Sequence, residues 1–285
     1  MPETELMYVR GRYVPAAEAT VAADDAGLLL GAGLFETLRT YGGRPFRLDR
    51  HLARLRASGG VFRIAVRESD EEIAAILARL LEANGLADAR VRLTATRGPL
   101  SAEDAPATLL VTAGPMTPYA EDLYRYGAVV VVSDVRANPT DPTVFHKTTA
   151  YMRSLLALRD AHEARATESL LLNTKNHLAE GAISNVFLVK GGRLLTPPVE
   201  EGLLAGITRQ AVLELAAEVG VHAEQATLII NDLLEAEEVF LTNSIMEVMP
   251  VARIEQHVVG QGEPGPVTRK LMEAYKDLVA CEVSQ

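Results

Sequence analysis

Hydrophobic and polar residues alternate with the period of β-strands in parts of this chain and repeat with the period of helices elsewhere. Apolar residues recur every three or four positions behind Ser69, which predicts a capped helix. A similar apolar stripe predicts a helix from Asp49 that ends at Gly59-Gly60. The elements predicted for the first half are a hairpin over residues 6–14, a strand over 34–41, helices over 49–58 and 70–84, and strands over 89–96 and 107–114.

The second half of the chain is richer in strands. It opens with a β-branched strand over residues 127–135, and a helix is predicted over 148–165, directly after Lys147. The later elements are predicted as strands over 168–173, 177–180, 184–190 and 193–196, a helix from Gly206 to about Val219, a strand over 238–242 and a helix over 266–280. Strands and helices are mixed without regular βαβ alternation. The pattern therefore predicts an α+β (mixed α/β) fold rather than a doubly wound sheet.

A break in the pattern between Gly114 and Gly127 predicts a boundary between two domains. The chain has 285 residues, which is more than one domain usually holds. Prolines and a short polar segment interrupt the strands at this point. We therefore predict an N-terminal domain over residues 1–115, a linker over 116–126 and a larger C-terminal domain over 127–285.

Composition narrows the classes of function. The formal net charge is −10 and the sequence pI is about 5.2, which disfavours partners that need a basic surface, such as nucleic acid or an acidic membrane. Cys281 is the only cysteine, so no intrachain disulfide can form. The N-terminus lacks an apolar signal segment, and no apolar run approaches the ~20 residues of a membrane span. We expect a soluble, cytoplasmic protein.

Several familiar catalytic motifs are missing from the sequence. Gly31-Ala32-Gly33 lacks the third glycine of a dinucleotide fingerprint, so a tight bend beside a ligand is the better interpretation. The six histidines form no HExxH or Cys/His pattern, and we expect no metal site. No GxSxG elbow or Walker loop is present. Of the five lysines, Lys147 lies between a Pro-containing loop and an apolar helix, but that position alone does not distinguish it from a solvated charge.

Four separated segments together carry a resemblance to a known family. They are GLLLGAGLFETLRTYGGRPFRLDRHLARLRAS at residues 27–58, FHKTTAYMRSLLA at 145–157, LLNTKNHLAEGAISNVFLVKGGRLLTPPVEEGLLAGITRQAV at 171–212 and EEVFLTNSIMEVMPV at 237–251. In order and spacing they resemble the fold type IV (class IV) pyridoxal-phosphate enzymes. That family includes branched-chain and D-amino-acid aminotransferases, R-selective amine transaminases and aminodeoxychorismate lyases. The resemblance implies a two-domain fold with a small N-terminal α/β domain, a larger C-terminal domain with a barrel-like sheet and the cofactor pyridoxal 5'-phosphate (PLP).

The same resemblance implies the catalytic residues. Lys147 matches the lysine that holds PLP as a Schiff base, and its amine would then move a proton at the substrate α-carbon. Glu180, in Ala-Glu-Gly-Ala-Ile-Ser-Asn, matches the carboxylate beside the pyridine nitrogen. A carboxylate there favours the protonated ring, which accepts electrons better.

The cofactor phosphate requires hydrogen-bond donors and a positive potential. Gly206 precedes a predicted helix, and the free N–H groups at a helix N-terminus suit an anion. The family match assigns Arg54 to the phosphate and Leu204 to the ring face. The residues implied for the rest of the phosphate cup are Gly206, Ile207, Thr208, Asn243 and Ser244.

Two reactions share this scaffold, and the sequence leaves the choice between them open. An aminotransferase would move an amino group between an amino acid or amine and a 2-keto acid, and we favour it as the commoner activity. An aminodeoxychorismate lyase would form 4-aminobenzoate and pyruvate, with Thr37 as a possible proton donor. Phe35, Arg97 and Tyr151 are further candidates for substrate contacts. A non-catalytic relative is a third alternative, against which the presence of Lys147, Glu180 and Arg54 argues.

The resemblance also implies partners. An aminotransferase of this family would bind a small-molecule amino donor and a keto acid. Relatives are homodimers in which loops of the neighbour close each site, so we expect a homodimer.

Overall fold

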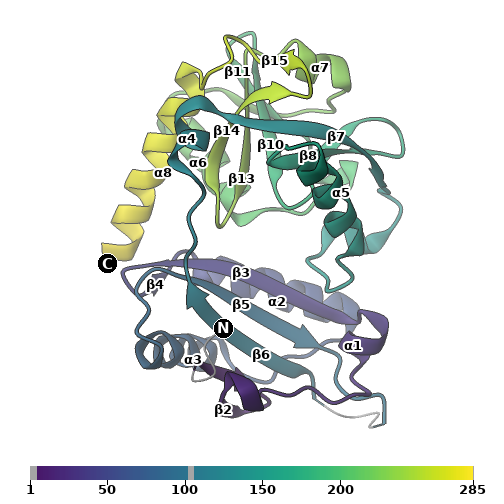
Figure 1. Ribbon diagram of the computed structural model, residues 1–285, viewed down its shortest axis with the longest axis vertical. Coiled ribbons are helices and arrows are strands. Elements are labelled where there is room, and N and C mark those ends of the chain that lie inside the picture. Colours follow the sequence, from purple (N-terminus) through teal and green to yellow (C-terminus); the bar gives the residue numbers. More distant parts are fainter. Residues whose placement is uncertain (1–4, 102–105, 285) are drawn as a thin grey trace. The chain divides into compact units, whose positions relative to one another are not determined.

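The computed structural model describes residues 5–101 and 106–284 and divides into two compact units (Figure 1). Unit 1 comprises the described residues up to Thr117, the short segment His146–Ala150 and the residues from Glu282 onward. Unit 2 comprises Pro118–Phe145 and Tyr151–Cys281. Each unit has its own sheet and its own hydrophobic core.

Unit 1 is built on an antiparallel sheet with the strand order β2-β1-β6-β5-β3-β4. Its strands are β1 (Leu6–Val9), β2 (Arg12–Pro15), β3 (Gly33–Tyr41), β4 (Arg44–Pro45), β5 (Ala89–Thr96) and β6 (Thr108–Pro115). Its helices are α1 (Ala26–Leu30), α2 (Leu48–Phe62), α3 (Asp70–Ala83) and the 3₁₀ turn η1 (Ala16–Glu18). Successive side chains of a strand point to opposite faces. Leu38 of β3 and Leu93 of β5 therefore share one face, where they are packed in one core cluster with Leu77 and other apolar residues of α3.

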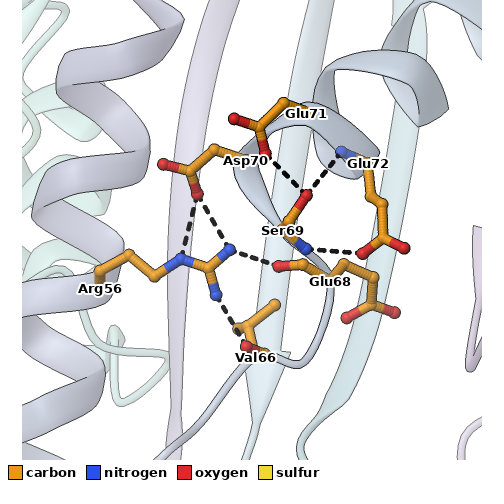
Figure 2. A network of polar contacts seen from close by, with 7 residues as sticks. All are labelled: Arg56, Val66, Glu68, Ser69, Asp70, Glu71 and Glu72. Atoms are coloured by element: carbon orange, nitrogen blue, oxygen red, sulfur yellow. Dashed lines mark hydrogen bonds and ion pairs between the residues drawn. The ribbon is translucent and has the colours of Figure 1, made fainter.

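The connection between α2 and α3 is closed by a polar network (Figure 2). The hydroxyl of Ser69 accepts from the Glu72 N–H, and the Glu72 carboxylate accepts from the Ser69 N–H at 2.7 Å, which completes the predicted capping box. The Arg56 guanidinium of α2 binds Asp70 at 2.9 Å and also donates to the carbonyls of Val66 and Glu68. The two helices are thereby joined at the point where α3 begins.

One predicted helix end is wrong. Helix α2 passes through Gly59 and Gly60 and ends at Phe62, with Arg63 in the left-handed conformation as its C-cap. The chain returns so tightly that a β-carbon at Gly59 would lie 2.6 Å from the Ile64 carbonyl oxygen. Glycine at this position therefore allows the close return of the chain and does not end the helix.

Unit 2 contains a nine-stranded, curled sheet with the order β12-β11-β10-β13-β14-β7-β8-β9 and with β15 paired to β14. Its strands are β7 (Ala128–Ala137), β8 (Glu168–Asn173), β9 (Leu178–Gly181), β10 (Asn185–Lys190), β11 (Arg193–Thr196), β12 (Ala223–Gln225), β13 (Glu238–Asn243), β14 (Glu247–Ile254) and β15 (His257–Val258). Its helices are α4 (Glu121–Tyr126), α5 (Met152–Glu163), α6 (Ile207–Glu218), α7 (Ile230–Leu234) and α8 (Pro266–Ser284), with 3₁₀ turns η2 (Pro142–Phe145) and η3 (Val199–Glu201). Strands β7, β8 and β14 run parallel to one another, whereas β10, β13 and β14 pair antiparallel.

The α+β fold class with a barrel-like sheet is confirmed. One predicted helix start differs from the structure, and one strand was missed. The predicted helix over 148–165 begins only at Met152, because residues 147–149 pair with β3 of unit 1. Strand β14 was not predicted, and it contains Pro250, which lies opposite Phe240 of β13. Within the described ranges, no helix combines the length and apolar character that crossing a membrane requires.

The domain division of the sequence analysis stays a prediction. The segment predicted as a linker, residues 116–126, includes helix α4. The segment His146–Ala150 packs with unit 1, although the sequence assigned it to the C-terminal domain. Backbone hydrogen bonds between this segment and β3 account for that position. The local sequence pattern does not reveal such pairing, because the two partners are far apart along the chain.

Candidate active site

Lys147 is held in extended backbone on the edge of β3. The Phe35 N–H donates to the Lys147 carbonyl at 2.9 Å, and Thr148 forms an antiparallel bridge with Leu34. The Thr149 N–H donates to the Gly33 carbonyl at 2.8 Å. The amine nitrogen of Lys147 lies 4.5 Å from the centre of the Phe35 ring. Backbone pairing therefore restricts where the half-buried Lys147 side chain can reach.

The residue before Lys147 is also anchored in unit 1. The Nδ1 atom of His146 lies 2.9 Å from the Ser58 hydroxyl of α2. The His146 ring makes an edge contact with Phe62 at a centroid distance of 4.9 Å. The lysine segment is thus fastened both to β3 and to α2.

Phe35 and Thr37 lie on the same face of β3, two positions apart. In the register of β3 and β5, Phe35 is opposite Thr94 and Thr37 is opposite Arg92. The Arg92 guanidinium lies 3.8 Å from the centre of the Phe35 ring. Lys147 and Arg92 therefore both contact Phe35, and this face presents positive charge beside an aromatic ring.

Two substrate candidates of the sequence analysis lie elsewhere. Arg97 follows β5 with an exposed side chain, and its N–H donates to the Ala32 carbonyl at 3.0 Å. Tyr151 is the N-cap residue of α5 in unit 2. Their roles stay predictions. Arg92 was not selected from the sequence, although strand alternation places it on the face of Thr37 as soon as the register is known.

Arg54 forms a buried ion pair with Glu36. The guanidinium donates from Nε to Oε1 at 2.8 Å and from Nη2 to Oε2 at 2.6 Å, while Nδ1 of His51 lies 2.7 Å from Oε2. The Glu36 side chain is only 1% exposed and that of Arg54 is 15% exposed. A fork of two parallel hydrogen bonds sets both the position and the direction of a guanidinium.

The titration behaviour of this cluster follows from burial and charge. Burial alone would raise the pKa of Glu36, but the charge and hydrogen bonds of Arg54 and a hydrogen bond to His51 outweigh it and lower the pKa to about 2. Burial lowers the pKa of His51, against the opposing effect of Glu36. The sequence analysis selected Arg54 but missed its two partners. His51 and Arg54 are three residues apart on α2, a spacing that puts them on one helical face.

Glu180 and Leu204 are directly bonded in unit 2. The Glu180 Oε2 atom accepts from the Leu204 N–H at 3.0 Å, and its Oε1 atom lies 3.7 Å from Nη2 of Arg153. The Leu204 carbonyl accepts from the Asn185 amide at 2.9 Å. Both backbone groups of Leu204 are therefore hydrogen-bonded, the N–H to a carboxylate and the carbonyl to a side-chain amide.

Gly206 is the N-cap residue of α6 and leaves no room for a side chain. A β-carbon there would overlap the Asn185 Oδ1 atom. No side-chain cap closes this end of α6, and Ile207 and Thr208, its first two residues, are buried. The first N–H groups of a helix have no partner within the helix, and they attract anions. This end of α6 has the donors and the polarity that a phosphate requires.

Asn243 joins the loop of residues 243–246 to the loop of residues 180–185 through hydrogen bonds. Its Oδ1 atom accepts from the N–H groups of Ile245 and Met246, both at 2.8 Å, and its amide nitrogen donates to the Ile183 carbonyl at 3.1 Å. Ser244 lies half-buried within this turn. Residues 180–185, 202–206 and 243–246 include residues that the sequence analysis assigns to the cofactor, and we refer to them as the cofactor loops. They are thus joined by hydrogen bonds within unit 2.

The structure brings the predicted residues together only in part. In unit 1, Lys147 contacts Phe35, whereas Arg54 binds Glu36, whose side chain points to the opposite face of β3. Unit 1 holds Lys147, Phe35, Thr37 and Arg54, and unit 2 holds Glu180, Leu204, Gly206, Ile207, Thr208, Asn243 and Ser244. Within unit 2, a carboxylate that can accept from a pyridine N–H and a helix N-terminus that can donate to a phosphate are groups that PLP requires, so the residues of this unit fit the cofactor. Asn185 was missed as a site residue, although it stands in the quoted Ser-Asn pair, because an amide that shapes a loop has no sequence signature of its own.

Comparisons with known proteins identify the family of this chain. The family model of class IV amino-transferases matches residues 33–254. A putative branched-chain-amino-acid aminotransferase of Methanocaldococcus jannaschii is 36% identical over 95% of this chain and 96% of its own length. The aminodeoxychorismate lyase of Bacillus subtilis is 33% identical over 95% and 94% of the two chains. The D-alanine aminotransferase of Bacillus licheniformis is 31% identical over 96% and 97%.

Solved structures support the same relationship. The branched-chain amino acid aminotransferase of Escherichia coli superposes with a TM-score of 0.91 at 29% sequence identity, over 97% of this chain and 95% of that one. Another solved branched-chain amino acid aminotransferase that matches this chain was crystallised with pyridoxamine 5'-phosphate. Sequence and structure thus agree over nearly the whole length: this chain belongs to the class IV aminotransferases, which are PLP-dependent enzymes.

Proposed function

We propose that this protein is an aminotransferase that moves an amino group between an amino acid or amine and a 2-keto acid, with Lys147 as the point of cofactor attachment. The observation that carries the proposal is the backbone pairing of Lys147 to β3, which brings its amine to the Phe35 ring. A solvated surface lysine has no need of such anchoring. Family membership supports the same assignment.

When bound, PLP supplies an aldehyde that reacts with an amine and a ring that withdraws electrons. In our proposal Glu180 keeps the ring nitrogen protonated through its negative charge. Leu204 would pack against the ring. The amine of Lys147 would take the proton from the substrate α-carbon and deliver it to the cofactor.

The phosphate contacts in this proposal are those that the family resemblance implies. The N–H groups of Ile207 and Thr208 donate at the N-terminus of α6, and Ser244 adds a hydroxyl. Arg54 contributes a charge whose direction Glu36 fixes. Asn243 shapes its loop through three hydrogen bonds, so we assign it to the support of Ser244.

For the substrate we propose contacts on the face of β3 that carries Phe35 and Thr37. The Phe35 ring is apolar and buried, and the half-buried Arg92 has a guanidinium suited to a carboxylate. Arg97, with its exposed side chain, is the weaker candidate of the two arginines.

Aminodeoxychorismate lyase activity is the second candidate. It is favoured by the relative of that name, which is 33% identical, and by the position of Thr37 on the face of Phe35, where a hydroxyl could donate a proton. The first relative and the superposed structure carry aminotransferase names, and we therefore keep the aminotransferase as the main proposal.

Two experiments test this function. Borohydride reduction of the protein with bound PLP, followed by digestion and mass spectrometry, should place the pyridoxyl mass on Lys147. The Lys147→Ala variant should lose the label, while Lys175→Ala, in a turn of unit 2, should keep it. A label on another lysine refutes the assignment.

A second experiment distinguishes the two reactions. The protein is incubated with D- and L-amino acids plus a keto acid, and separately with aminodeoxychorismate. Release of 4-aminobenzoate without amino transfer would make aminodeoxychorismate lyase the main proposal.

We further propose that the chain forms a homodimer. Leu28, Leu29 and Leu30 of α1 are 66%, 56% and 68% exposed, a continuous apolar surface that is unusual on a monomer. Light scattering should give twice the 30.7 kDa chain mass for the wild type, and Leu29→Glu should lower it. A wild-type monomer at micromolar concentration would contradict this proposal.

A further inference from the structure

Glu168, the first residue of β8, is a carboxylate that is completely buried in unit 2. Its Oε1 atom accepts from the Ser169 N–H at 2.9 Å. Its Oε2 atom accepts from the Ser184 hydroxyl at 3.0 Å and from the Ile183 N–H at 3.3 Å. All of these donors are neutral. A carboxylate held by neutral donors is costly to bury, so a specific reason for keeping it is expected.

The contacts of Glu168 lead directly to the cofactor loops. Ile183, whose N–H it binds, offers its carbonyl to Asn243 at 3.1 Å. Ser184 is followed by Asn185, whose amide holds the Leu204 carbonyl at 2.9 Å. One buried carboxylate thus anchors the residues through which the three loops are joined.

The packing around Glu168 leaves little freedom for this turn. A β-carbon at Gly181 would overlap the Ser184 hydroxyl and lie 3.3 Å from the Glu168 carboxyl carbon. Burial raises the pKa of Glu168 to about 7, although the hydrogen bonds from Ser169, Ser184 and the turn oppose that shift. The turn is therefore folded directly against the acid.

We infer that Glu168 is a positioning residue that holds residues 181–185 so that Glu180, Leu204 and the N-terminus of α6 are aligned for the cofactor. The inference rests on the proposed function. Glu168 itself acts only through the loops. Glutamine has the same shape but replaces one acceptor oxygen by a donor. In either orientation its NH₂ group faces the N–H of Ser169 or of Ile183, and one hydrogen bond is lost.

Glu238 offers a matched control in the same unit. It is also buried and also accepts from two backbone N–H groups and one hydroxyl, those of Val267 and Thr268 at 2.7–3.0 Å. These contacts hold the start of α8. Five residue steps of extended strand, roughly 17 Å, separate Glu238 from Asn243 at the far end of β13.

The experiment compares the wild type, Glu168→Gln and Glu238→Gln, each freed of cofactor and titrated with PLP. The readouts are the dissociation constant and the visible circular dichroism of the bound cofactor, which reports ring orientation, with far-ultraviolet dichroism as the check of folding. We expect Glu168→Gln to weaken PLP binding about tenfold or more and to reduce the visible dichroism at saturation. Glu238→Gln should keep both within about twofold, whatever it does to stability.

Three outcomes decide the inference. If Glu168→Gln binds PLP like the wild type with unchanged dichroism, the inference is wrong. It is equally wrong if Glu238→Gln changes both readouts to the same degree. Should Glu168→Gln fail to fold, Ser184→Ala removes only the hydroxyl donor and should show the same changes at smaller size, whereas no change refutes the inference. If the wild type itself does not bind PLP, the proposed function fails instead.

Discussion

Replacing Glu36 by glutamine removes the negative charge to which Arg54 and His51 are bound. All three side chains are largely buried, so water cannot replace the lost interaction. The variant keeps the volume of the side chain but leaves a guanidinium next to a neutral amide. We expect lower stability of unit 1 and weaker binding of the cofactor phosphate, since Arg54 loses the carboxylate that fixes its direction.

The magnitude follows from the pKa of Glu36. It falls from an ordinary 4.5 to about 2 in the folded protein, and each pKa unit corresponds to ~1.36 kcal/mol, which gives about 3 kcal/mol at pH 7. Because the folded pKa is the lower one, this stabilisation is complete above pH 4.5 and is lost as the pH falls through 2. Breaking a buried ion pair from one side costs roughly 3–5 kcal/mol in general, in agreement with that value.

Urea unfolding of the cofactor-free protein, followed by far-ultraviolet dichroism, measures this effect. The difference between wild type and Glu36→Gln should be about 3 kcal/mol at pH 7 and less than half of that near pH 3. Asp70→Asn is the matched control, because Asp70 binds Arg56 at 2.9 Å but both side chains are substantially exposed. Asp70→Asn should lower the free energy of unfolding by less than about 1 kcal/mol. Equal costs for the two variants, or a difference that does not depend on pH, would refute the reasoning.

Three further predictions follow from the described contacts. Gly206→Ala should displace Asn185 and weaken PLP binding about tenfold or more in an absorbance titration, and wild-type affinity would contradict this. Gly60→Ala should raise the stability by about 0.5–1 kcal/mol, seen as a higher melting temperature, because this helical position has open space for a methyl group. The pKa of Glu168 is higher in the folded protein than in the unfolded chain. Its contribution to the free energy of unfolding is therefore complete below pH 4.5 and is lost as the pH rises through 7. Relative to Glu168→Gln, the wild type should lose about 3 kcal/mol of unfolding free energy over that interval, and a constant difference would contradict the assignment.

Much of the secondary structure could be predicted from local patterns. The capping box at Ser69 placed the start of α3, and strand alternation placed β5 at its observed bounds. Glycines were the less reliable signal. Gly59 was interpreted as a helix stop, yet it lies inside α2 because the following chain passes too close for a side chain.

The candidate site residues came from a family resemblance and not from local patterns. Lys147, Glu180 and Arg54 were selected because they stand in segments that resemble a family, and the family itself is confirmed. Their individual roles remain proposals. Glu36, Asn185 and Glu168 were not selected, since each acts through a partner that is distant in sequence or hidden in a turn.

What the sequence alone determined was therefore local or shared with relatives: the periods of strands and helices, the acidic charge and the motif around Lys147. The tertiary structure decided which side chains meet. It paired the backbone of Lys147 with β3 and bound Arg54 to Glu36 through hydrogen bonds. It also buried Glu168 against the turn that follows Glu180. The physical reason is that pairing and burial depend on residues far apart along the chain, and such contacts leave no periodic trace in the sequence.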